Sequence, residues 1–216
     1  MHRLDVTVAG YVLNSFSLSA AFISPLVGVL IRWTGRYKWL SMTGIPFVAL
    51  GTGLLIHFRR PESKVGYLVM CQLFNGIGTG IWTTTGQIGM MAAVNHQEIA
   101  VVLALYSLFG SIGSAVGNAI AGALWTNIFP ERLYAELPDD SKNLTATIYA
   151  DIVTQMSYTE GPIRDAIVDA YAHVQRMMVI TGAAFIPLLV AFLFMWRNID
   201  LKKRQQEQGQ SKGNIW

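Results

Sequence analysis

The segment from Ile99 to Ile128 contains no charged side chain and consists mainly of aliphatic residues, alanine and glycine. A helix crosses a hydrocarbon core about 30 Å thick with roughly 20 residues. The segment exceeds that length, so it predicts a membrane-spanning helix with room to tilt. At roughly 100° per residue, a set of small residues shares one face, where a neighbouring backbone can approach closely. We interpret this face as a helix-packing surface formed by Gly110, Gly113 and Gly117.

Similar apolar stretches recur along the chain. Only 13% of the residues are charged, whereas soluble domains average about 25%. The sequence therefore predicts an all-α fold, a polytopic transmembrane helix bundle of about five spans. Short links between the first four spans make them antiparallel neighbours. The predicted spans cover residues 9–31, 39–58, 66–94, 99–128 and 177–196.

A change of character divides the chain into four parts. After the first four spans comes a segment rich in Asp and Glu, too polar to enter lipid, and we interpret it as a long exterior loop. Gly161 and Pro162 begin a possible interfacial helix within it, which leads into the last span. A polar tail ends the sequence. The boundaries are 1–128 for the first four spans, 129–176 for the loop, 177–196 for the last span and 197–216 for the tail.

The distribution of basic residues bears on the orientation of the bundle. Because successive spans cross the membrane in opposite directions, the total of Lys plus Arg is the same on its two sides. Charges in long loops count less, and four of those on the loop side belong to the long loop. This weighting favours a cytoplasmic tail and an exterior loop. Asn143 begins an Asn-Leu-Thr glycosylation pattern in that loop, which agrees with this orientation.

Composition also excludes several classes of function. The net charge is +3, but the basic residues lie at span ends without interleaved aromatic residues, which excludes nucleic-acid binding. The four histidines fall in separate segments, and Cys71 is the only cysteine. We therefore expect no metal site built by the protein and no cofactor. The spans carry no cluster of His, Asp or Cys, so we expect no enzymatic activity.

The third predicted span carries a polar stripe. About a third of the helix circumference is shared by Gln72, Asn75, Thr79, Trp82, Thr83 and Gly86. Polar side chains within a span face the bundle interior or a water-filled cavity. We predict that a substrate pathway follows this stripe, although hydrogen bonding between helices explains it equally well. The candidate pathway residues are Asn75, Thr79, Trp82 and Gln87.

Two negative observations accompany the stripe. Gly76, Gly78 and Gly80 lie within the same span, and because no Rossmann unit surrounds them they do not predict a nucleotide-binding loop. None of the five spans contains Asp or Glu near its middle, where proton carriers of membrane pumps are common. We therefore expect any coupling carboxylate to lie outside this chain.

The link between the first two spans contains a recognisable pattern. Residues 28–38 read GVLIRWTGRYK, with a glycine in the helix, a turn glycine seven residues later, and cations that can cap helix carbonyls. The pattern resembles the loop motif of the major facilitator superfamily, except that Arg32 and Trp33 replace its acidic and basic residues. A merely basic turn is the alternative. The matching residues that we assign to a conformational loop are Gly28, Gly35, Arg36 and Lys38.

Longer runs carry a more specific resemblance. Residues 35–40, 90–98, 102–105 and 121–130 are similar to fungal siderophore-iron transporters of that superfamily. The resemblance implies fourteen predicted spans and import of ferric hydroxamate chelates with protons. The five spans here resemble the tenth to fourteenth, so an amino-terminal half is missing. The long loop resembles the family's last exterior loop, and its aromatic substrate candidates, or ordinary loop anchors, are Tyr149, Tyr158 and Tyr171.

Together these patterns predict the carboxy-terminal part of a proton-coupled siderophore transporter that works by alternating access. Its expected partners are the lipid bilayer, a ferric siderophore, protons and the missing amino-terminal half. The resemblance places it in the plasma membrane or, alternatively, in an endosomal vesicle membrane. A truncated membrane protein that inserts or binds a partner but transports nothing is the second hypothesis, because five helices cannot form two pseudo-symmetric halves.

Overall fold

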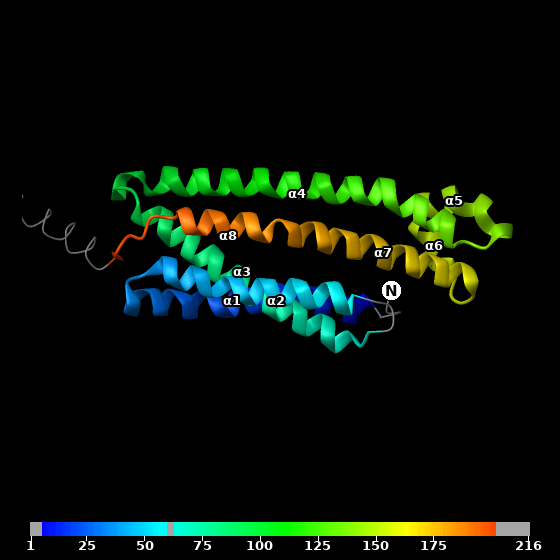
Figure 1. The fold of residues 1–216 in the computed structure, drawn as a ribbon, viewed down its shortest axis with the longest axis horizontal. Helices are drawn as coiled ribbons and strands as arrows, with labels where there is room; N and C mark the ends of the chain where they lie inside the picture. The colour runs from blue at the N-terminus through cyan, green and yellow to red at the C-terminus, as the bar shows by residue number, and fades with distance from the viewer. Residues whose placement is uncertain (1–5, 60–62, 202–216) are drawn as a thin grey trace, which may run out of the picture.

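The computed structural model describes residues 6–59 and 63–201, and every regular element in those ranges is a helix (Figure 1). The predicted all-α fold is confirmed. The long helices run back and forth between two ends of the molecule, an inner end at the α1–α2 turn and an outer end at α5 and α6. The elements are α1 (Val6–Thr34), α2 (Tyr37–Phe58), α3 (Val65–Ala92), η1 (His96–Glu98), α4 (Ile99–Glu136), η2 (Asp139–Leu144), α5 (Thr145–Ala150), α6 (Ile152–Ser157), α7 (Pro162–Ala184) and α8 (Ile186–Met195).

Four segments of the described chain are long and apolar enough to cross a membrane: Gly10–Thr34, Tyr37–Phe58, His96–Glu136 and Pro162–Met195. The third predicted span, α3, is not among them. It has 28 residues, about 42 Å of helix, but its amides and hydroxyls reduce its apolar character. It packs against both α1 and α2, so its polar stripe is enclosed by protein on at least two sides.

Glycines allow α3 to approach its two neighbours closely. A Cβ atom at Gly76 would collide with the Phe16 carbonyl and the Ser19 hydroxyl of α1. One at Gly80 would lie 2.8 Å from the carbonyl oxygen of Ala20. At these positions a larger residue would force α1 away from α3.

The predicted packing face of α4 has a different environment. None of the apolar window of α4 is buried, and a Cβ atom at Gly110, Gly113 or Gly117 would meet nothing within 4 Å. In Figure 1, α7 and α8 lie between α4 and the pair formed by α1 and α2, whereas α4 meets α3 near the inner end, where Tyr106 lies close to Gly86. Among the residues that the structure describes, therefore, no helix lies against the small-residue face of α4.

Two helices, α4 and α7, extend into the segment predicted to be a loop. The fourth span was expected to end at Ile128, whereas α4 continues through Pro130 to Glu136. Burial of Phe129 and Leu133 supports this extension despite the missing proline N–H. The expected interfacial helix after Gly161 is the beginning of α7, which runs without interruption into the last span. Most of the expected loop is thus helical.

The outer end folds into a small cap, which we define as residues 129–174. Its buried core joins the end of α4 to α5 and to the first half of α7. Aromatic rings border the core, with Trp125 and Phe129 stacked at 4.5 Å between ring centroids. This core explains why a segment rich in acidic residues is ordered. Its buried members are Phe129, Leu133, Leu137, Ile148, Ala166, Ile167, Ala170 and Val174.

Candidate substrate-binding site

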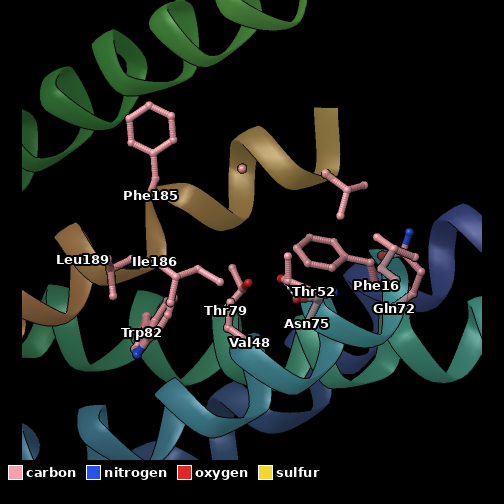
Figure 2. A pocket seen from close by; sticks show the side chains of 13 residues that line it. Phe16, Val48, Thr52, Gln72, Asn75, Thr79, Trp82, Phe185, Ile186 and Leu189 are labelled. Atoms are coloured by element: carbon pink, nitrogen blue, oxygen red, sulfur yellow. Dashed lines mark hydrogen bonds between the residues drawn. The ribbon is translucent and has the colours of Figure 1, made fainter. Parts of the chain in front are cut away.

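A cavity of about 390 Å³ lies between α3 and the α7–α8 segment (Figure 2). Pockets for small molecules commonly measure roughly 300–1,000 Å³. The polar stripe of α3 forms one wall, α1 and α2 contribute at its sides, and α7 and α8 form the opposite wall. The lining residues are Phe16, Val48, Thr52, Leu55, Gln72, Asn75, Thr79, Trp82, Val179, Gly182, Phe185, Ile186 and Leu189.

Asn75 lines the cavity and also joins two helices. Its side-chain oxygen accepts a hydrogen bond of 3.0 Å from the Thr52 hydroxyl of α2, and its amide nitrogen donates to the Cys71 carbonyl at 3.1 Å. A Cβ atom at Gly51 would lie 2.8 Å from the Asn75 side chain, so glycine is needed for this approach. The amide is held in one orientation at the cavity wall.

Trp82 combines the same two roles nearer the inner end. Its indole N–H donates to the Ser41 carbonyl of α2 at 2.9 Å, and the ring lies against Gly44. Because the indole N–H is occupied, the ring offers the cavity an apolar surface. Both explanations of the polar stripe therefore apply to Asn75 and Trp82, which bond between helices and line the cavity.

The remaining stripe residues separate into two groups. Thr79 and Gln72 line the cavity beside Asn75, and Figure 2 shows Thr79 between α3 and the opposite wall. Gln87 is exposed and lies outside the cavity. It comes after Trp82 on α3, nearer the inner end and beyond the residues that line the cavity. Helical periodicity identified the polar face but not the depth at which the cavity ends.

The apolar wall from α7 and α8 was not anticipated from the sequence. These two helices follow one another with a break at Phe185, whose backbone angles are φ −83° and ψ −12°. Pro187 provides the reason, since a proline lacks the N–H needed to continue the ladder. Phe185 is 50% exposed and lies at the cavity edge. The proline in the last predicted span was the available signal for this break.

At the inner end, the carboxyl end of α8 is held to the first turn of α2. The Lys38 ammonium donates to the carbonyls of Phe194 at 2.8 Å and Trp196 at 2.6 Å. The Tyr37 hydroxyl donates to the Arg197 carbonyl at 2.5 Å. A cation at the carboxyl end of a helix is favoured by the helix dipole and by the unpaired carbonyls. We call this set of contacts the inner tie.

At the outer end, a second contact joins the carboxyl end of α2 to α7. The Arg59 Nε donates to the Gln175 side-chain oxygen of α7 at 3.0 Å. Burial lowers the pKa of Arg59, which immediately follows α2. We call this contact the outer tie. Because the two ties hold α7–α8 to both ends of α2, the cavity walls belong to one connected unit.

Comparison with known proteins identifies the family. Residues 2–130 match the family model of the Major Facilitator Superfamily, which is more than half of the chain. The chain belongs to the Major Facilitator Superfamily. No solved structure matches it.

Curated relatives within the superfamily agree with the resemblance seen in the sequence. The chain is 51% identical over 215 residues to "MFS siderochrome iron transporter 1" of Ajellomyces capsulatus, which covers 99% of this chain and 38% of that protein. It is 41% identical to "MFS siderochrome iron transporter B" of Aspergillus fumigatus, covering 100% and 35%. It is 39% identical to "Siderophore iron transporter mirB" of Emericella nidulans, covering 96% and 34%. The chain therefore spans about a third of the length of these relatives.

The residues matching the superfamily loop motif have different structural roles. Gly35 has φ 70°, in the left-handed region that favours glycine, and its N–H bonds to the Ile31 carbonyl at 2.7 Å. Lys38 forms the inner tie. Arg36 is exposed and takes no part in it, and a Cβ atom at Gly28 would meet nothing within 4 Å. Of the four motif residues in this superfamily member, Lys38 thus contacts the end of the last helix, and the Gly35 carbonyl accepts a hydrogen bond of 3.1 Å from the Leu201 N–H beyond it.

The three loop tyrosines pack against the cap core. The Tyr171 hydroxyl donates to the Gln155 side-chain oxygen at 2.6 Å, and the Gln155 amide donates to the Ile148 carbonyl at 2.6 Å. Tyr149 packs against Phe129, and Tyr158 also borders the core. These contacts fit the loop-anchor alternative. Asn143 is exposed near the end of η2, so its side chain is accessible for glycosylation.

Proposed function

We propose that this chain is the carboxy-terminal part of a transporter that imports ferric siderophore chelates with protons by alternating access. The observation that carries the proposal is the cavity on the polar stripe of α3. Thr79 lies near the middle of α3, and transporter sites of this type lie near the membrane midplane. The curated relatives named above are siderophore-iron transporters.

The chemistry of the cavity suits a neutral polar ligand. None of its 13 lining residues is ionisable, amide and hydroxyl groups are present, and the Trp82 ring adds an apolar aromatic surface. Hydroxamate anions neutralise the charge of the ferric iron that they chelate, so a ferric hydroxamate needs hydrogen bonds and apolar contact rather than a counter-ion. Iron arrives already chelated and is the cargo, with no protein ligand required.

The inner tie and the outer tie indicate which helices move together as one rigid body. Alternating access proceeds by rigid-body rocking of one bundle against another around a fixed site. Since Lys38 and Arg59 hold α7–α8 to α2 at both ends, these helices move together with α1 and α3. In this proposal the missing amino-terminal half is the second body, and Gly28, Gly35, Arg36 and Lys38 serve the conformational change.

The proposed setting is an integral position in the plasma membrane or an endosomal vesicle membrane. The inner end faces the cytoplasm, and the cap faces the exterior, where it handles the arriving chelate. The proton-coupling carboxylate lies in the missing part, since no lining residue of the cavity is Asp or Glu.

Paired threonine variants test the binding site. Thr79→Val removes a hydroxyl from the cavity wall with little change of shape, whereas Thr83→Val removes an exposed hydroxyl one turn away, outside the cavity. In a full-length relative carrying the equivalent changes, we expect the first to reduce uptake of radiolabelled ferric hydroxamate and the second to leave it intact. Cell-surface abundance is measured in parallel. Equal uptake by the two variants at equal abundance would contradict the assignment.

Trp82→Ala is the larger change at the same site. It removes the indole from the cavity and the bond to the Ser41 carbonyl, and we expect it to lower uptake while surface expression stays normal. Trp82→Phe keeps an aromatic wall without the N–H donor. If Phe restores uptake, the ring surface contacts the chelate; unchanged uptake in Trp82→Ala would exclude Trp82 from the pathway.

Reconstitution separates this function from the second hypothesis of a membrane protein that transports nothing. The 216-residue chain alone is incorporated into proteoliposomes with an imposed proton gradient, and entry of labelled ferric hydroxamate is followed. We expect binding, detected as quenching of tryptophan fluorescence, without accumulation. Accumulation would show that the chain transports by itself, and absence of binding would favour a non-transporting protein.

A further inference from the structure

A second cavity, of about 330 Å³, lies at the inner end of the bundle, where α1 passes into α2. It shares no lining residue with the substrate cavity. It begins at the loop and continues along the first two turns of α2. Its lining residues are Thr34, Arg36, Trp39, Leu40 and Thr43.

Arg36 is the one charged residue of this lining, and within the described part of the chain no carboxylate uses its charge. Lys38 is occupied by the carbonyls at the end of α8, whereas no carboxylate of residues 6–59 or 63–201 pairs with the exposed Arg36 guanidinium. The hydroxyls of Thr34 and Thr43 donate to carbonyls of their own helices, at 2.8 Å and 2.6 Å. The five guanidinium donors are therefore available to a ligand from outside.

The surroundings of the cavity match the boundary between lipid and water. Trp39 is 61% exposed and Trp33 is 71% exposed, and tryptophan is enriched at the level of lipid headgroups. From Arg36 to Thr43 the helix rises about 10 Å, which is comparable with the roughly 5–8 Å of each polar layer of a bilayer. One phospholipid could thus place its charged headgroup at Arg36 and the apolar start of an acyl chain at Leu40.

The inner end also carries an excess of positive charge. Among the described residues there, four cations accompany two carboxylates, and the Glu98 carboxylate already accepts a bond from the Asn95 backbone N–H. Positive charge beside a membrane attracts anionic lipids by about 1 kcal/mol for each Lys or Arg. The cations are Arg32, Arg36, Lys38 and Arg197, and the carboxylates belong to Glu98 and Asp200.

We propose that this cavity binds an anionic phospholipid. The Arg36 guanidinium contacts the phosphate of the headgroup, whose geometry it matches with two parallel donors. Trp39 lies along the glycerol region, and Leu40 and Thr43 contact the beginning of an acyl chain. The site is independent of the substrate cavity and holds a structural lipid at the loop that carries the superfamily motif.

Spin-labelled lipids test this site in the intact chain. The chain is reconstituted in phosphatidylcholine vesicles, and electron paramagnetic resonance measures its preference for spin-labelled phosphatidylglycerol over spin-labelled phosphatidylcholine. We expect Arg36→Gln to reduce this preference at least tenfold, because it removes charge-assisted hydrogen bonds to the phosphate, worth about 1.5–3 kcal/mol, in addition to surface charge. Arg32→Gln removes the same charge from the same end but outside the cavity, and we expect it to reduce the preference by no more than about fivefold, the value of general surface attraction.

A second readout reports position. Brominated phosphatidylglycerol should quench the fluorescence of Trp39 more than brominated phosphatidylcholine does, and this difference should disappear in Arg36→Gln and in Trp39→Phe. Equal losses of preference in Arg32→Gln and Arg36→Gln would show general surface attraction and overturn the site. Displacement of the spin-labelled lipid by inorganic phosphate would show a site for free anions and would also overturn the proposal.

Discussion

Helices α3 and α4 both carry three glycines within one short stretch, yet their surroundings are opposite. Gly76, Gly78 and Gly80 of α3 are buried against α1 and α2, whereas the glycines of α4 are exposed. The small-residue face of α4 predicted close packing against another helix. The glycines of α3 only superficially resemble a nucleotide-binding loop. A glycine pattern shows that close approach is possible, but the rest of the fold decides where a partner helix lies.

The comparison has an energetic side. A glycine within a helix costs roughly 0.5–1 kcal/mol relative to alanine. In α3 this cost is offset by the close packing of two neighbours. In α4 (residues 99–136), no described helix packs over the apolar window to offset this cost. The helix is buried mainly where Phe129 and Leu133 enter the cap. We predict that the small face of α4 packs against a helix of the complete transporter.

The largest expected effect tests whether the cap anchors α4. Phe129→Ala removes a fully buried ring and should destabilise the cap by about 3–5 kcal/mol. Phe109→Ala removes a ring of the same helix that is 67% exposed and should change stability little. Limited proteolysis of the chain in detergent micelles measures the difference at residues 129–174. Equal resistance of the two variants to protease would show that α4 is held by other contacts.

The next effect tests the glycines directly. Gly76→Ala places a methyl group against the Phe16 carbonyl, and the resulting overpacking should cost about 1–3 kcal/mol. Gly113→Ala has open space around it and should stabilise the isolated chain by about 0.5–1 kcal/mol. Thermal unfolding in detergent, followed by circular dichroism, compares the two. If Gly76→Ala stabilised the chain, glycine would not be required for the close approach of α1 and α3, and the contrast between α3 and α4 would fail.

In the full-length transporter the glycine of α4 is expected to behave differently. Once a partner helix covers this face, Gly113→Ala should lose its stabilising effect or become destabilising. The same thermal assay on an intact relative checks this outcome. If Gly113→Ala stabilises both the chain and the intact relative, the small face of α4 meets lipid.

A smaller effect concerns the inner tie. Lys38→Gln removes a charge from the carboxyl end of α8 and should cost about 1 kcal/mol. Hydrogen exchange should accelerate in residues 190–201, while α1 and α3 remain protected. Lys64→Gln removes a charge from an exposed position at the outer end and serves as the control. Unchanged exchange in Lys38→Gln would mean that Tyr37 alone maintains the tie.

The smallest effect belongs to the cap surface. The Thr154 hydroxyl and the backbone N–H groups of Val153 and Thr154 bond to the Asp151 carboxylate and hold its pKa below the ordinary 3.8. The hydrogen bonds from the start of α6 to the Asp151 carboxylate are therefore complete at pH values above the ordinary pKa. They are lost as the pH falls through the lower pKa that this carboxyl group has in the folded protein. The amide resonance of Val153 should titrate with a midpoint below 3.8. Titration at or above 3.8 would contradict the bond.

Local patterns predicted a large part of the fold and of the site. Uncharged stretches indicated the membrane helices, and the polar stripe placed Asn75, Thr79 and Trp82 on the face that lines the cavity. The turn at Gly35 followed from the requirement for a positive φ. These features depend on residues close together in the chain, whose spacing determines a shared face. Gln87 shows the limit, because its place on the same predicted span did not put it within the cavity.

The sequence by itself determined that this protein is a helical membrane protein of the Major Facilitator Superfamily, because apolar length and motif spacing are local properties. Only the tertiary structure decided which glycines pack, which wall α7 and α8 contribute, and which atoms form the inner tie. The acceptors for Lys38 and Tyr37 are backbone carbonyls, which every residue possesses. No side-chain pattern marks them, so only the approach of distant helices could select them.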